Sequence, residues 1–175
     1  RKYADLRDML LAASRTPGVD ADRKKGWLRE IAGLCETQLR DLDTAINAWK
    51  QLASLERGDE TAKNQLRRLL ERAQRWDDLA TLLEQEAEQT ADVEARISME
   101  KSLAKLHEQK RKDPAASGEA WARIARLTPE DEAAVTTAVK LFEKGGRLDL
   151  AAQAIDENAA NVTDERARAQ LLRKL

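Results

Sequence analysis

The feature that most constrains this chain is an internal repeat with an offset of 72 residues. Residues 20–55 align with residues 92–127 without a gap, and the same register continues well beyond that stretch. The matched pairs are Asp20 with Asp92, Ile31 with Leu103, Ala32 with Ala104, Trp49 with Trp121, Leu69 with Leu141, and Arg75 with Arg147. A register held over most of the chain indicates duplication, so we expect an array of similar structural units.

Helical periodicity runs through both copies. Trp76, Leu79, Leu82 and Leu83 have the spacing of one apolar helix face. Only 3% of the residues are aromatic, and 36% are charged, which is typical of exposed helices rather than of strands. We therefore predict an all-α chain in which each repeat contains two helical hairpins. About ten helices are expected, over residues 3–14, 21–39, 42–55, 60–73, 76–90, 93–110, 115–127, 131–144, 148–160 and 164–175.

The sequence contains no linker or low-complexity segment, which predicts a single domain over residues 1–175. The chain begins with Arg1 rather than Met, so we expect it to be a fragment of a longer protein. Apolar residues near both ends would lack a neighbouring helix within the fragment. These are Leu6 at the start and Leu171, Leu172 and Leu175 at the end. We expect the parent chain to continue there, or these ends to meet another copy.

Small and large apolar residues recur at fixed places in each hairpin. In the first full unit, Ile31 and Ala32 form a large–small pair, and Ala45 and Trp49 follow in the second helix. Later units carry Leu66, Leu70, Trp76, Leu79 and Leu83, then Leu103, Ala104, His107, Ala116 and Trp121, then Phe142, Gly146, Leu148, Ala151 and Ile155. This pattern resembles a divergent tetratricopeptide repeat array of the bacterial type. The resemblance implies a right-handed α-solenoid of stacked antiparallel hairpins, although other helical-hairpin solenoids share much of the pattern.

The resemblance also implies a binding surface. In such arrays the first helix of each hairpin lines a concave groove, and residues two before and two after the large residue of the large–small pair point into it. The corresponding residues here are Arg29, Gly33, Asn64, Arg68, Lys101, Lys105, Thr136 and Lys140, of which five are basic and none is acidic. The candidate partner-binding residues are Arg29, Asn64, Arg68, Lys101, Lys105 and Lys140. They form either a solvated face with intrahelical ion pairs or a groove for an acidic or carboxylate-ended peptide.

Catalysis is not expected. The single histidine, His107, occupies a repeat position that usually holds an aromatic residue, and Cys35 occupies the same position one repeat earlier. Two residues so far apart in a solenoid cannot form a nucleophilic pair. Gly145–Gly146 lacks the strand and the Lys–Ser/Thr pair of a phosphate loop. One histidine and one cysteine do not make a zinc site, so no metal and no cofactor are predicted.

The tryptophans carry a structural prediction. Trp49, Trp76 and Trp121 fall on repeat positions and are expected in the core. Trp27 falls off the pattern and is either an interlayer filler or an exposed contact residue.

The charge balance narrows the class of partner. The formal net charge is −1, which does not favour nucleic acid. No apolar run is long enough to span a bilayer, so membrane insertion is not expected. The sequence thus predicts a non-enzymatic adaptor for a protein or peptide partner. The alternative is self-assembly through the terminal helices. A cytoplasmic location is expected, with the periplasm as the other possibility.

Overall fold

The computed structural model describes residues 2–56 and 58–161, and about 84% of these residues are helical. This part of the chain contains nine α-helices, two short π-helical turns and no strand, so the predicted all-α class is confirmed. In chain order the elements are α1 (Lys2–Ser14), α2 (Ala21–Leu34), η1 (Cys35–Leu39), α3 (Leu42–Leu55), α4 (Glu60–Arg72), α5 (Trp76–Gln89), α6 (Val93–Leu106), η2 (His107–Arg111), α7 (Pro114–Leu127), α8 (Glu132–Lys144) and α9 (Leu148–Asn161).

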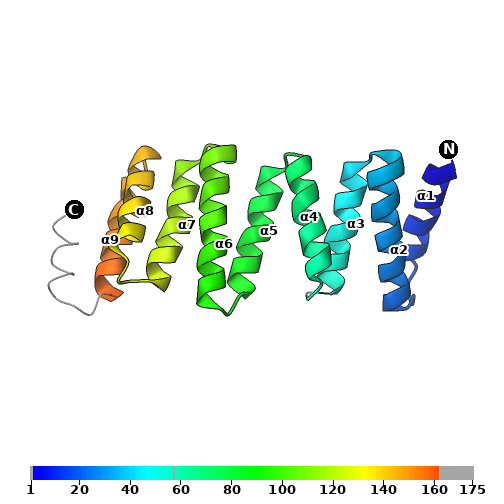
Figure 1. Ribbon diagram of the computed structural model, residues 1–175, viewed down its shortest axis with the longest axis horizontal. Helices are drawn as coiled ribbons and strands as arrows, with labels where there is room; N and C mark the ends of the chain where they lie inside the picture. Colours follow the sequence, from blue (N-terminus) through cyan, green and yellow to red (C-terminus); the bar gives the residue numbers. More distant parts are fainter. Residues whose placement is uncertain (1, 57, 162–175) are drawn as a thin grey trace. The chain divides into compact units, whose positions relative to one another are not determined.

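The chain divides into two compact units between Arg75 and Trp76. Unit 1 contains α1 to α4, and unit 2 contains α5 to α9. Within each unit, consecutive helices run antiparallel and pack side by side (Figure 1). In unit 2, α7 also contacts α9 as well as its immediate neighbours α6 and α8.

The helix positions agree closely with those expected from periodicity. The largest difference concerns the helices expected over 21–39 and 93–110. Each of these is an α-helix that widens into a π-helical turn over its last five residues, η1 or η2. The helix expected over 164–175, which includes Leu171, Leu172 and Leu175, lies outside the described residues.

The π-helical turns end in the same way in both repeats. A left-handed residue closes each turn, Arg40 with φ 54° and Lys112 with φ 57°. The next residue, Asp41 or Asp113, donates its N–H to the first carbonyl of the turn, at 2.9 Å and 3.0 Å. The same aspartate then caps the following helix, because its carboxylate accepts the N–H three residues further on. The 72-residue offset therefore holds for backbone geometry as well as for residue type.

A second pair of turns repeats at that offset, after α4 and after α8. Gln74 and Gly146 have positive φ angles of 55° and 71°. In each turn the following N–H donates to a carbonyl five residues earlier, at 2.9 Å from Arg75 and 2.8 Å from Arg147. This is the Schellman arrangement, which satisfies carbonyls that the helix end leaves open. Glycine accepts the left-handed conformation without a Cβ penalty, whereas Gln74 does not have that advantage.

The core of unit 1 lies between α2, α3 and α4. Leu28, Ile31, Ile46, Leu52 and Leu69 are fully buried there, at 0% exposure each. Their spacing along each helix is that of a single apolar face, as the sequence predicts. Removing such side chains from water is the main stabilising contribution to the unit.

The core of unit 2 depends on small residues between α7 and α8. A Cβ at Gly118 would lie 2.8 Å from Cδ1 of Phe142, so only glycine allows the two helices to approach this closely. Ala138 is also buried in this contact. The alanine-rich composition thus serves close packing of helix on helix.

The tryptophans differ in burial. Trp49 is 9% exposed, and Trp27, Trp76 and Trp121 are half-buried. Leu148, which the sequence places on the apolar face of α9, is 67% exposed, and the buried face of that helix begins one turn later at Ala151. In the part of the chain that the structure describes, no helix has both the length and the apolar character to cross a bilayer.

Candidate functional site

Arg29, the first predicted binding residue, is engaged within unit 1. Its guanidinium lies 3.0 Å from the carboxylate of Asp59, which is itself the N-cap of α4 and accepts the N–H of Ala62 at 2.9 Å. These two bonds, with that of Ala62 the larger, hold the pKa of Asp59 below its ordinary value. The contact ties α2 to the start of α4, so it joins two helices instead of lying within one.

Arg68 and Asn64 on α4 are engaged as well. Arg68 donates to the carboxylate of Glu36, which also accepts the indole N–H of Trp49 at 3.1 Å. Asn64 accepts a hydrogen bond from Arg67 at 2.9 Å. The sequence predicts intrahelical pairs as one reading of these positions, and Asn64 with Arg67 fits it. The Arg68 pair instead joins α4 to η1.

The predicted lysines of unit 2, unlike the predicted residues of unit 1, are not bonded to other described side chains of their unit. Lys101 and Lys105 are exposed one turn apart on α6, and Lys140 is exposed on α8. None of the three has an ion pair or hydrogen bond from its ammonium group within the described residues. Both α6 and α8 pack on α7 and do not contact each other. Of the remaining predicted positions, Gly33 is exposed and Thr136 is half-buried.

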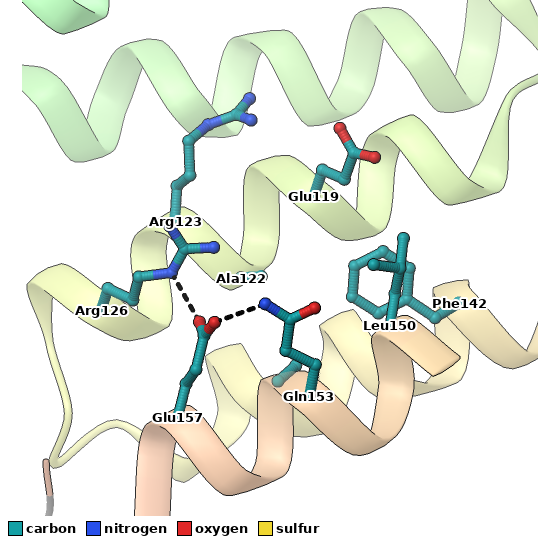
Figure 2. Close-up of a pocket in the computed structure, with 9 residues that line it drawn as sticks. Glu119, Ala122, Arg123, Arg126, Phe142, Leu150, Gln153 and Glu157 are labelled. Atoms are coloured by element: carbon teal, nitrogen blue, oxygen red, sulfur yellow. Dashed lines mark hydrogen bonds and ion pairs between the residues drawn. The ribbon is translucent and has the colours of Figure 1, made fainter. Parts of the chain in front are cut away.

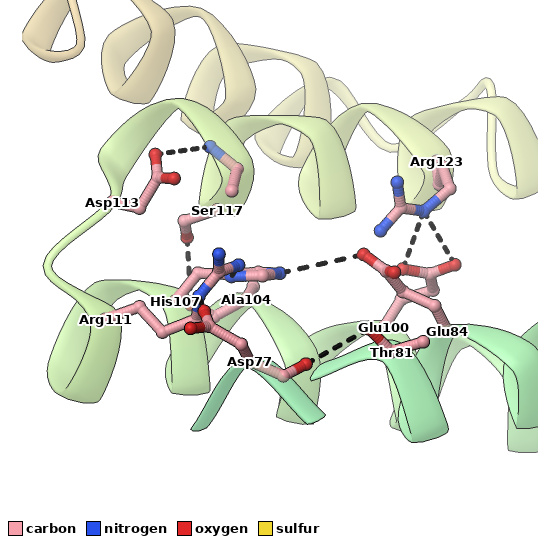
Figure 3. A network of polar contacts seen from close by, with 11 residues as sticks. Asp77, Thr81, Glu84, Glu100, Ala104, His107, Arg111, Asp113, Ser117 and Arg123 are labelled. Atoms are coloured by element: carbon pink, nitrogen blue, oxygen red, sulfur yellow. Dashed lines mark hydrogen bonds and ion pairs between the residues drawn. The ribbon is translucent and has the colours of Figure 1, made fainter. Parts of the chain in front are cut away.

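A buried ion pair in unit 2 was missed by the sequence analysis (Figure 3). The side chain of Glu100 is 3% exposed, and both its oxygens accept from Nε of Arg123 at 2.9 Å. A carboxylate in such a place requires a partner, since burying an unpaired charge is very costly. The equivalent positions of the first repeat are Leu28 and Gln51. A position-by-position comparison of the two repeats would have revealed this pair as a charge where the other copy has leucine.

His107 belongs to the same polar region (Figure 3). Its Nδ1 accepts from Arg111 at 2.8 Å, and its Nε2 lies 4.0 Å from the carboxylate of Glu84. Burial, and then the charge of Arg111, lower the pKa of His107 to about 4. The imidazole is therefore neutral at pH 7, with its proton on Nε2. Arg111 also pairs with Asp77 at 2.7 Å, so the network connects α5 with η2.

Cys35 occupies the equivalent position in unit 1. Its thiol is fully buried, and burial, followed by the charge of Asp41, raises its pKa to about 11. A thiol with this pKa remains protonated at neutral pH and is a poor nucleophile. Cys35 and His107 lie in different units. Across residues 2–56 and 58–161, no group of three or more His, Cys, Asp or Glu side chains is arranged to hold a metal ion.

Unit 2 also contains a pocket of about 210 Å³ between α7, α8 and α9 (Figure 2). Its apolar lining comes from Ala122, Phe142, Leu150 and Ala154. Its polar lining comes from Glu119, Arg123, Arg126, Gln153 and Glu157. Sequence reasoning did not identify this pocket, because it depends on how three helices meet.

Comparison with known proteins does not assign a function to any of these sites. No family model matches the sequence, and no curated protein matches it.

Proposed function

We propose that this chain is a non-enzymatic scaffold that presents an exposed helical surface to a protein or peptide partner. Its hairpins would stack as an α-solenoid similar to tetratricopeptide arrays. The proposal is supported by the two repeats, which share their helix caps and their left-handed turns at a 72-residue offset. Repeated hairpins of this kind bury their apolar faces against their neighbours, and stability becomes a sum of neighbour contacts. A cytoplasmic location is part of this proposal.

The observation that carries the binding proposal is the state of the three exposed lysines. Lys101, Lys105 and Lys140 have no neutralising partner among the described residues, so their charge is available to a ligand. An acidic or carboxylate-ended segment of a partner provides the complementary charge. Arg29, Asn64 and Arg68 take a secondary role in the proposal, because each would have to exchange a bond within unit 1 for a bond to the partner.

A charge reversal tests the proposal. The probe is a fluorescent ten-residue peptide of Glu and Asp with a free carboxylate. The variant K101E/K105E/K140E should lower its affinity about tenfold or more at low salt, with helical content unchanged, because exposed substitutions disturb stability little. The matched control is K2E/R15E/R23E, which makes the same change in net charge at exposed cations of unit 1.

Comparison with the control variant shows whether a loss of affinity comes from the three lysines or from net charge alone. If both variants lose affinity equally, only net charge matters and the proposed surface is wrong. If neither variant changes the affinity, an acidic partner is wrong for this protein.

Self-assembly is the second candidate, and exposed apolar side chains on α1 favour it. Tyr3 is 50% exposed and Met9 is 62% exposed. Large apolar groups exposed on a helix favour association when they form part of a larger patch.

A further inference from the structure

The pocket between α7, α8 and α9 has a closed apolar floor. Phe142 is 2% exposed, Ala122 is 6% exposed and Ala154 is 8% exposed. Leu150 is half-buried and forms part of the wall (Figure 2). Such a lining suits a short hydrocarbon chain, which gains by leaving water, and it provides nothing that would bind a charge by itself.

Both arginines that line the pocket are already neutralised. Arg126 lies 3.1 Å from the carboxylate of Glu157. Arg123 gives its Nε to Glu100. The pocket therefore does not offer a free cation to an anionic ligand.

Two acceptors on the rim remain unused. Gln153 donates its amide N–H to Glu157 at 2.7 Å, which leaves its side-chain oxygen directed away from that carboxylate and towards the apolar wall (Figure 2). Glu119 is exposed and has no ion pair within the described part of the chain. The nearby guanidinium of Arg147 is bonded twice to Asp149, at 3.0 Å and 2.8 Å. The bonds to Asp149, and to a smaller extent the charge of Glu119, raise the pKa of Arg147, but Glu119 and Asp149 together outnumber that one cation, so this part of the rim carries one negative charge in excess.

The first repeat differs from the second at one position of the pocket wall. The residue that corresponds to Ala122 is Lys50, 72 positions earlier, and it is half-buried on α3. The same position of the repeat thus holds a lysine in one copy and only the methyl group of an alanine in the other.

We propose that this pocket binds the side chain of a lysine from a protein partner. Its methylene chain lies against Phe142 and Leu150, and its ammonium group reaches the carboxylate of Glu119 and the side-chain oxygen of Gln153. A long cationic side chain has this division into an apolar stem and a charged end. The site is separate from the lysines of the proposed function and does not depend on them.

The test uses n-pentylammonium as the probe, because it reproduces a lysine stem and its charge. Titration into the full chain should produce saturable shifts in the methyl NMR signals of Leu150 and Ala154, with a Kd on the order of millimolar for so small a ligand. n-Pentanol and pentanoate have the same stem without the charge or with the opposite charge. Both should bind more weakly than the ammonium ion.

The variant Glu119→Gln should weaken n-pentylammonium binding about threefold and leave n-pentanol unchanged, as expected for one exposed ion pair. The control Glu143→Gln removes an exposed carboxylate of α8 that does not line the pocket, and should have no effect. Stronger binding of pentanoate, equal binding of all three probes, or no loss in Glu119→Gln would each overturn the proposal.

Discussion

At the scale of single residues, His107 illustrates how burial decides chemistry. The repeat pattern assigns it to an aromatic position, and the structure buries it with 1% exposure. Its ring nitrogens face an arginine on one side and a carboxylate on the other, as in many catalytic sites. Yet the imidazole has a pKa of about 4 because the charged form is poorly solvated, so it titrates below the range in which general bases usually work.

This pKa predicts the effect of acid on stability. The folded-state pKa of His107 is below the unfolded value of 6.5, so the unfolded chain binds the proton more tightly. Its contribution to the free energy of unfolding is therefore lost as the pH falls from about 6.5 towards 4. Between pH 7 and pH 5 the wild type should lose about 2 kcal/mol more than His107→Gln. Urea unfolding at both pH values measures this difference, and equal losses would contradict the assigned pKa.

At the scale of helices, the two repeats have different residues at one equivalent contact between neighbouring helices. In unit 2, Glu100 on α6 pairs with Arg123 on α7. The equivalent residues of unit 1 are Leu28 on α2 and Gln51 on α3. An ion pair that replaces leucine in a buried contact seldom adds stability, because the desolvation of both charges opposes their attraction.

Substitution towards the first repeat tests this comparison. Arg123→Gln alone should lower the free energy of unfolding by about 3 kcal/mol at pH 7, because it leaves Glu100 buried without its cation. The double variant E100L/R123Q should recover to within about 1 kcal/mol of the wild type, since it buries the leucine that the first repeat has at this position and removes both charges. Chemical denaturation of the wild type, both single variants and the double variant measures the four free energies of unfolding of a double-mutant cycle. Additive losses would show that the two side chains are not coupled.

At the scale of the whole molecule, the question is whether the chain associates with itself. The exposed side chains of Tyr3 and Met9 favour association through α1, whereas the charged surfaces of both units favour a monomer.

Sedimentation velocity from micromolar to about millimolar concentration distinguishes the two states. If α1 mediates association, the wild type should form a dimer with rising concentration, and Met9→Glu should shift the dissociation constant upwards about tenfold or more. The matched control is Val93→Glu, which replaces an exposed apolar residue at the start of α6 and should leave the dissociation constant unchanged. A wild type that remains monomeric throughout would remove self-assembly as a function of this chain.

Much of the local structure follows from the sequence because its causes are local. Helix periodicity, aspartate caps such as Asp41 and Asp113, and the glycine at position 146 all act within a few residues of themselves. Equivalent turns of the two repeats also share their geometry, as the left-handed residues Arg40 and Lys112 show. The widening of α2 and α6 into π-helical turns does not follow from periodicity, because their last residues keep a helical pattern.

The sequence alone predicted that the chain is helical and where most of the described helices lie, and its 72-residue register indicated two related copies. Only the tertiary structure decided which of the predicted cations are engaged. Arg29 and Arg68 meet carboxylates from other helices, at Asp59 and Glu36, whereas Lys101 meets none among the described residues. The physical reason is that an ion pair between helices depends on the distance between two faces, and residues 30 or 32 positions apart carry no periodic signal of that distance.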